Sequence, residues 1–318
     1  MAQPGSNGSS SPSNGSTPHA PAGQPAPARR RSPLPLAILA ALFIIVPFLT
    51  WYGTWFGRKL SDEDTGRYLT EESNPRHVQH ALLQVAERLD QKDSSVRKWY
   101  PQLVKLSGSS MTELRSMVAW VMGKDTRAKE FHSALLVLIA DREPIVRFNA
   151  APALAAFGDK QARPELRAML QDFSVVSPGE GTIGSVLAEG APARAGALLA
   201  RLTLPGGEMR EIRAPVPGRI SRVLVGEGAK VKTGDELLLL SPDAESVWEA
   251  LRGLLLVGES DDLPLVRKYA GGERGIPEKV KEQAAQTALA IQARANKEGK
   301  DGAASSSESP SPSSSTSP

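Results

Sequence analysis

Apolar residues recur at intervals of three and four positions between residues 74 and 172, which is the spacing of one face of an α-helix. Val78, Leu82, Val85 and Leu89 mark the first such face, and shorter apolar groups follow at positions 103–106, 114–121 and 135–139. The same spacing returns at 246–270, where it predicts a pair of helices. The pattern therefore predicts a stack of short helices, interrupted between residues 173 and 245.

The segment 140–170 carries the most specific helical pattern. Pro144 suits the first turn of a helix, and Asp141 can cap that helix. The arrangement D..P.VR..AA.AL..FGD in this segment resembles a HEAT repeat, including the short type of the phycobilisome-lyase-like proteins, and a weaker copy lies at 278–291. The resemblance implies an α-solenoid that presents surfaces to other proteins, with an ordinary helical bundle as the alternative.

The segment 174–241 changes character, because short apolar runs bounded by Gly and Pro replace the helical spacing. Within it, residues 178–202 and 215–240 are near-repeats offset by 37 and then 38 positions. The pattern predicts two strand–turn–strand halves related by a pseudo-twofold axis. The matched residues are Gly181, Ile183, Val186, Leu187, Glu189, Gly190, Gly196 and Leu199 in the first half, and Gly218, Ile220, Val223, Leu224, Glu227, Gly228, Gly234 and Leu237 in the second.

The second half resembles the C-terminal half of a biotinyl/lipoyl domain. The resemblance is carried by Ala214, Pro215, Pro217, Gly218, Val223, Gly228, Val231, Gly234 and Leu237. It implies a barrel-sandwich hybrid, a flattened barrel of two four-stranded sheets that occurs in swinging-arm carriers and in membrane fusion proteins.

The chain departs from the carrier pattern at the residue that would be modified. In carriers a Lys precedes the Pro of the second half by eight positions, whereas Gly207 stands at that place here, and no Lys occurs from 161 to 229. An amide-linked biotin or lipoate needs a Lys amine, so we expect no cofactor. The hairpin tip is then a candidate contact surface, formed by Pro205, Gly206, Gly207 and Glu208.

Residues 34–56 contain no charged side chain and end in Trp51, Tyr52 and Trp55. As one helix they would extend about 34 Å, enough to cross a bilayer core of about 30 Å. The sequence therefore predicts a single-pass protein of a bacterial inner membrane, with a cytoplasmic N-terminus and a periplasmic bulk. The alternatives are a buried helix of a soluble core and a cleaved signal peptide.

Composition sets the limits of the folded part. Residues 1–32 and 298–318 are rich in Pro, Ser, Gly and Ala, which predicts disordered tails. The predicted parts are thus a transmembrane helix at 34–56, a HEAT-like domain at 60–172 and 245–297, and an inserted all-β domain at 174–241. This is an α+β multidomain fold. A net charge of +3 shows no nucleic-acid footprint, and the absence of Cys excludes disulfides and thiol chemistry.

Several residues were candidates for chemistry, and we expect none of them to be catalytic or to hold a metal. His77 and His80 lack a third ligand nearby in the sequence, and His132 stands alone. Asp141 and Arg147 are expected to cap or bridge repeats. The remaining candidates, Glu208, Glu211 and the Gly-rich run at 179–184, lack a partnering base or the strand-to-helix context of a phosphate loop.

These observations favour a membrane-anchored, non-enzymatic scaffold that binds protein partners through the concave face of the stack and the hairpin tip. One alternative is an accessory subunit of an envelope efflux or secretion system related to membrane fusion proteins. The other is an enzyme resembling the bilin lyases.

Overall fold

The computed structural model describes residues 34–51, 59–271 and 275–306. The chain divides into two units, residues 1–58 and 59–318, which are described separately. The predicted tail at 1–32 and the end of the other tail, 307–318, lie outside the described residues. Helix α11 continues to Ser306, so it includes the first residues of the segment expected to be a C-terminal tail.

The first unit contributes one described helix, α1 (Leu34–Trp51), with Pro47 inside it. Across the described residues, no helix combines the length and the apolar character needed to span a membrane. The predicted transmembrane helix at 34–56 is therefore wrong, and so are the single-pass and inner-membrane predictions that depended on it. Residues 52–56 lie outside the described residues.

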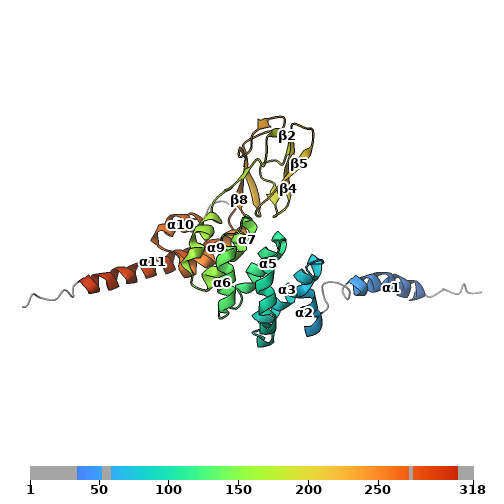
Figure 1. Cartoon of the computed structure of the whole chain (residues 1–318), viewed down its shortest axis with the longest axis horizontal. Coiled ribbons are helices and arrows are strands. Elements are labelled where there is room, and N and C mark those ends of the chain that lie inside the picture. The colour runs from blue at the N-terminus through green and yellow to red at the C-terminus, as the bar shows by residue number, and fades with distance from the viewer. Residues whose placement is uncertain (1–33, 52–58, 272–274, 307–318) are drawn as a thin grey trace, which may run out of the picture. The chain divides into compact units, whose positions relative to one another are not determined.

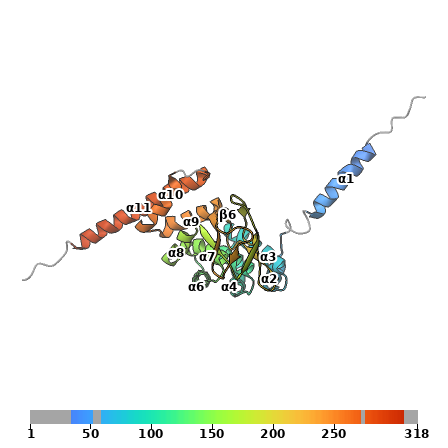
Figure 2. The ribbon, with the colours of Figure 1, turned by 90° about the horizontal axis from the view of Figure 1, so that it is seen from above.

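The second unit contains ten described α-helices that alternate between two layers (Figures 1 and 2). The inner layer is a ladder in which each helix contacts the next: α3 (Pro75–Asp90), α5 (Thr112–Met122), α7 (Pro144–Ala156), α9 (Ala244–Val257) and α11 (Glu278–Ser306). Each is preceded by an outer helix that packs on it: α2 (Asp62–Thr70), α4 (Tyr100–Leu106), α6 (Lys129–Leu138), α8 (Arg163–Ala168) and α10 (Leu263–Ala270). Short 3-10 turns lead into three outer helices: η2 (Ser94–Trp99), η3 (Lys160–Ala162) and η4 (Ser260–Asp262).

Local sequence explains where these helices begin. Pro144 occupies the first turn of α7, as predicted, and Asp243 caps α9 by accepting a hydrogen bond from Ser246 N at 2.8 Å. Helix α2 was not predicted, because its acidic start resembles a charged flank. Ser61 caps it, and Asp62, Glu63 and Asp64 fill the first turn, where negative charge is favourable.

The segment 278–291 was predicted to resemble the repeat at 140–170, and matched residues of the two segments are buried alike. Val146 and Val280 are fully buried, as are Ala150 and Ala284, at corresponding positions of α7 and α11. Small residues also let the inner helices approach closely, since a Cβ built on Gly123 would lie 2.8 Å from Ala153 Cβ. The stack therefore has one continuous apolar core.

Between α8 and α9 the chain forms two four-stranded antiparallel sheets, with strand orders β1-β8-β6-β3 and β5-β4-β2-β7. The strands are β1 (Phe173–Val176), β2 (Gly181–Val186), β3 (Pro192–Ala193), β4 (Leu198–Thr203), β5 (Met209–Arg213), β6 (Gly218–Val223), β7 (Lys230–Val231) and β8 (Glu236–Pro242). Hydrogen bonding stays within each sheet and closes no barrel, so the predicted barrel-sandwich hybrid is corrected to two separate sheets.

The near-repeat in the sequence is a repeat of structure. Strands β2, β3 and β4 correspond to β6, β7 and β8, and each half gives its short middle strand to the other half's sheet: β3 pairs with β6, and β7 pairs with β2. Matched glycines of the two halves adopt the same backbone conformation. Gly190 and Gly228 have φ values of 83° and 80°, in the left-handed region that other residues rarely adopt.

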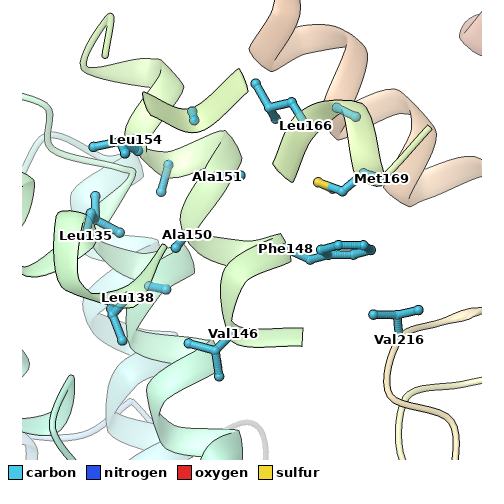
Figure 3. Close-up of a cluster of buried hydrophobic side chains, with 14 of the residues drawn as sticks. Leu135, Leu138, Val146, Phe148, Ala150, Ala151, Leu154, Leu166, Met169 and Val216 are labelled. Carbon is cyan, nitrogen blue, oxygen red and sulfur yellow. The ribbon is translucent and has the colours of Figure 1, made fainter. Parts of the chain in front are cut away.

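The β region is fixed to the helical stack at the turn between β5 and β6. Figure 3 shows Val216 of this turn facing Phe148 of α7 and Met169 after α8. All three side chains are buried, with exposures of 2%, 7% and 3%. At the entry to the region, Asp172 accepts hydrogen bonds from Ser221 Oγ at 3.1 Å and Ser241 Oγ at 2.8 Å. The insertion is therefore packed on the stack.

Candidate functional site

A groove of about 850 Å³ runs over the inner layer of helices. Helices α5, α7, α9 and α11 supply its walls, and Pro217 of the β5–β6 turn closes one end. The sequence predicted the concave face of the stack as a contact surface, and the groove lies on that layer. The residues that shape it could not be chosen from the sequence, because they come from four repeats.

Apolar side chains form much of the groove surface. Trp120 of α5 is 42% exposed and Leu256 of α9 is 51% exposed, although both are large and apolar. Phe148 and Met169 lie deeper and are buried. Large apolar groups left accessible within a concave surface mark sites where proteins bind other molecules.

Charged groups alternate with the aromatic rings. Lys124 Nζ lies 4.4 Å from the Trp120 ring centroid and 2.8 Å from Asp90 Oδ2. Arg252, another residue of the lining, has its guanidinium 4.7 Å from the ring centroid of Trp248 on the same helix, α9. These contacts order long side chains against aromatic faces.

Glu249 is a half-buried titratable residue of the groove lining. Burial raises its pKa, although the nearby Arg252 guanidinium opposes that shift at an N···O distance of 3.5 Å. On the α7 wall, Asn149 donates hydrogen bonds of 2.9 Å to Ser116 Oγ and to the Ile145 carbonyl oxygen, which fixes its amide. The groove thus offers apolar surface with ordered polar groups at its edges, an arrangement suited to binding a protein segment.

The predicted contact residues Pro205, Gly206, Gly207 and Glu208 form the exposed turn between β4 and β5. Leu204 N donates to the Glu208 carbonyl at 2.8 Å, and Gly207 has a φ of 84°. Met209, next to the turn, is 67% exposed. The tip therefore projects to solvent, and its role in binding stays a prediction. Glu211 pairs with Arg213 on the adjoining strand, and the Gly-rich run at 179–184 leads into β2 rather than a helix.

The two histidines of α3 have separate surroundings. His77 Nδ1 lies 2.8 Å from Glu71 Oε2, and its ring stacks on Tyr68 with centroids 4.1 Å apart. His80 Nε2 lies 3.0 Å from Gln84 Nε2. Burial, with a smaller effect of His77, lowers the pKa of His80. Among the described residues, no group of three His, Asp or Glu side chains is placed to hold a metal ion.

Asp141 and Arg147 bridge repeats, as expected from the sequence. Both Asp141 carboxylate oxygens accept hydrogen bonds from Arg115 of α5, at 2.7 Å and 3.0 Å. Asp141 Oδ1 also accepts from Glu143 N at the start of α7. Arg147 donates to the Asp141 carbonyl oxygen and to Glu165 Oε1 on α8, both at 2.9 Å.

His132 is not an isolated surface residue. Its Nε2 lies 2.9 Å from Asp159 Oδ2, and its ring centroid lies 5.4 Å from that of Phe157. It therefore joins α6 to the turn after α7.

A family model described as HEAT repeats matches residues 100–176. This part of the helical stack carries HEAT repeats. No curated protein matches the chain. Among solved structures, the chain is similar to the complex of CpcE and CpcF of phycocyanin lyase from Nostoc sp., with 17% identity and a TM-score of 0.40 over 75% of this chain and 67% of that chain.

A second similar structure is a single-chain, multi-domain long-chain acyl-CoA carboxylase, with 29% identity and a TM-score of 0.22 over 32% of this chain. The chain covers only 9% of the length of that carboxylase. Both TM-scores are below 0.5, so neither likeness supports a statement about the activity of this chain.

Proposed function

We propose that this HEAT protein is a non-enzymatic scaffold that holds a protein segment in the groove of its inner layer. The observation that carries the proposal is the groove itself. It has a volume of about 850 Å³, lies on the inner layer of helices, and leaves Trp120 and Leu256 accessible. HEAT repeats generally present such extended surfaces to protein partners. Side chains already ordered by their own contacts lose less conformational entropy when a partner binds.

The proposal also assigns a role to the β region. We infer that it is an unmodified relative of biotinyl/lipoyl domains that acts as a fixed platform. Support comes from the duplicated strand order, from Gly207 at the position of the carrier Lys, and from the packing of Val216 on Phe148 and Met169. A swinging arm needs freedom to move, and burial of Val216 against the stack removes that freedom.

Neither alternative gains support from a specific observation. The envelope-transport accessory depended on a membrane anchor, and the described residues contain no helix able to cross a bilayer. The bilin-lyase alternative came from the repeat pattern at 140–170, and the likeness to the phycocyanin lyase complex, with a TM-score of 0.40, adds no argument for it.

Affinity capture with matched variants tests the proposed function. The full chain, a Leu256→Arg variant and a Val137→Arg variant would each be used to capture proteins from cell extract. Val137 is 72% exposed on the outer helix α6, so its replacement introduces the same charge away from the groove. We expect one set of partners for the full chain and Val137→Arg, and its loss with Leu256→Arg. Equal capture by all three proteins, or substrate turnover by the purified chain, would refute the scaffold.

A further inference from the structure

A second cavity, of about 410 Å³, lies beside the groove. It is formed where α3 ends, where η2 begins and where the loop between α5 and α6 returns to the stack. Asp90 and Lys124 belong to the linings of both cavities, and their ion pair of 2.8 Å stands between them. Nothing in the proposed scaffold function uses this second cavity.

The carboxylates around the cavity are already neutralised by the protein's own cations. Asp90 pairs with Lys124, Asp93 with Arg88 at 2.7 Å, and Asp125 with Arg127 at 2.9 Å. The buried Tyr100 hydroxyl also donates to Asp125 Oδ2 at 2.7 Å. Burial, and then this hydrogen bond, raises the pKa of Tyr100, so the phenol keeps its proton and continues to donate.

Two cations of the lining lack a carboxylate partner, and one of them, Arg97, interacts with the Tyr100 hydroxyl instead. Lys92 and Arg97 are exposed, and neither forms an ion pair with any of the described residues. Lys92 is also the one described residue other than glycine with a φ in the left-handed region, 61°. Lys92 N donates to the Leu89 carbonyl, and Asp93 N to the Arg88 carbonyl, both at 2.9 Å. These bonds hold the turn in a conformation that a non-glycine residue adopts at a cost.

Hydroxyl groups complete the set of donors. Ser94 and Thr126 line the same cavity and are exposed, and their hydroxyls make no hydrogen bond within the described part of the chain. A guanidinium, an ammonium and two hydroxyls are the groups that bind the oxygens of a tetrahedral oxyanion. A phosphate monoester carries between one and two negative charges at neutral pH, which matches the two cations that form no ion pair.

We propose that this cavity binds a phosphate monoester group, with Arg97 and Lys92 as its cationic contacts and Ser94 and Thr126 as hydroxyl donors. None of these four residues lines the groove, so failure of this proposal would leave the scaffold function untouched. The same chemistry fits a small phosphorylated molecule and a phosphorylated serine on a partner protein.

Isothermal titration calorimetry on the full chain tests the site with two probes, inorganic phosphate and a short phosphoserine peptide, at constant ionic strength. The test variant is Lys92→Gln/Arg97→Gln. The control is Lys105→Gln/Arg76→Gln, which removes one Lys and one Arg that are exposed, lie outside the cavity and form no ion pair with any of the described residues. Circular dichroism would confirm that both variants keep the fold.

We expect saturable binding to the unaltered chain and the control, and a loss of affinity of at least about tenfold in the test variant, because charge-assisted hydrogen bonds are the strong ones. Tighter binding of the peptide would point to a phosphorylated partner, and tighter binding of inorganic phosphate to a small molecule. No saturable binding of either probe, or equal affinities in the test and control variants, would overturn the proposal.

Discussion

At the scale of single residues, the most consequential contact joins the two sides of the β insertion. The carboxylate of Asp262 is fully buried and receives Arg163 Nε at 3.0 Å and Arg167 Nη1 at 2.6 Å from α8. Glu259 N also donates to it, at 2.7 Å. Burial would raise the pKa of Asp262, but these hydrogen bonds outweigh burial and lower it. The network holds the repeats together before and after the inserted sheets.

Replacing Asp262 by Ala should therefore be strongly destabilising. It leaves two guanidinium groups short of a buried partner, and we expect the free energy of unfolding to fall by about 3–5 kcal/mol. Urea denaturation measures the change. Asp261→Ala is the matched control, because the Asp261 side chain is 68% exposed and should contribute less than about 1 kcal/mol. Similar losses for the two variants would show that burial of the network is unimportant.

Depressed carboxylate pKa values predict the response to acid. Hydrogen bonds from Ser95 and Arg88 lower the pKa of Asp93 from 3.8 to about 2, and Arg115 lowers that of Asp141. A carboxyl whose pKa is lower in the folded state stabilises the fold fully above the unfolded value, and this contribution disappears as the pH falls through the folded value. The free energy of unfolding should therefore decrease between about pH 4 and pH 2.

Denaturation curves recorded at several pH values would check this, and an Asp93→Asn variant should show a shallower decrease. A stability that stays level or rises over that interval would be inconsistent with the ion pairs described.

Residue roles could be predicted from the sequence where they depend on local spacing. Asp141 and Arg147 were expected to cap or bridge, and both bridge: Asp141 binds Arg115 of α5, and Arg147 binds Glu165 of α8. Asp141 does not cap α7, whose N-cap is Glu143. The groove residues Trp120 and Leu256 could not be selected, since their exposure depends on how distant repeats pack. Lys92 and Arg97 were missed for the same reason.

At the scale of elements, the clearest success was the repeat within the β region. Eight matched positions, offset by 37 and then 38 residues, predicted two equivalent halves, and the strands show the same order in each. The exchange of β3 and β7 between the sheets was not predictable, because two-residue strands carry no alternation of their own. The helices followed their apolar spacing, except for the short acidic α2.

The duplication predicts that equivalent glycines are equally intolerant of a side chain. A Cβ on Gly181 would lie 2.4 Å from the Thr203 carbonyl oxygen, and one on Gly218 would lie 2.5 Å from that of Ser241. Each Gly→Ala change should lower the free energy of unfolding by about 1–3 kcal/mol, since the backbone must move.

Gly206→Ala supplies the control for this pair, because no atom lies within 4 Å of its added Cβ. Thermal or urea unfolding would rank the three variants. A Gly206→Ala variant as unstable as the other two would argue against close packing as the cause.

At the scale of the second unit, the sheets and the HEAT stack should unfold together. Val216 is 2% exposed where the β5–β6 turn meets the stack, and Val216→Ala removes buried methyl groups there. We expect a loss of about 1–2 kcal/mol and a separation of the transitions of the two parts. Differential scanning calorimetry measures both. Val176→Ala, at a position that is 47% exposed, should have little effect, and an equal effect of both changes would contradict the docking.

The largest error from the sequence also belongs to this scale. Residues 34–56 form a long uncharged run, but no helix among the described residues has the length and apolar character needed to cross a membrane. The closed barrel was likewise inferred from family resemblance, and hydrogen bonding instead closes two separate sheets.

Site-specific photocrosslinking tests the central claim, that partners bind the groove of the inner layer, most directly. A benzophenone amino acid would replace Leu256 in the groove or Val137 on α6 in the full chain, each with and without Trp120→Ala. The account predicts abundant adducts with one partner protein at position 256, few at position 137, and a marked loss at 256 when Trp120 is removed. Adducts as abundant at position 137, or unchanged at 256 without Trp120, would contradict it.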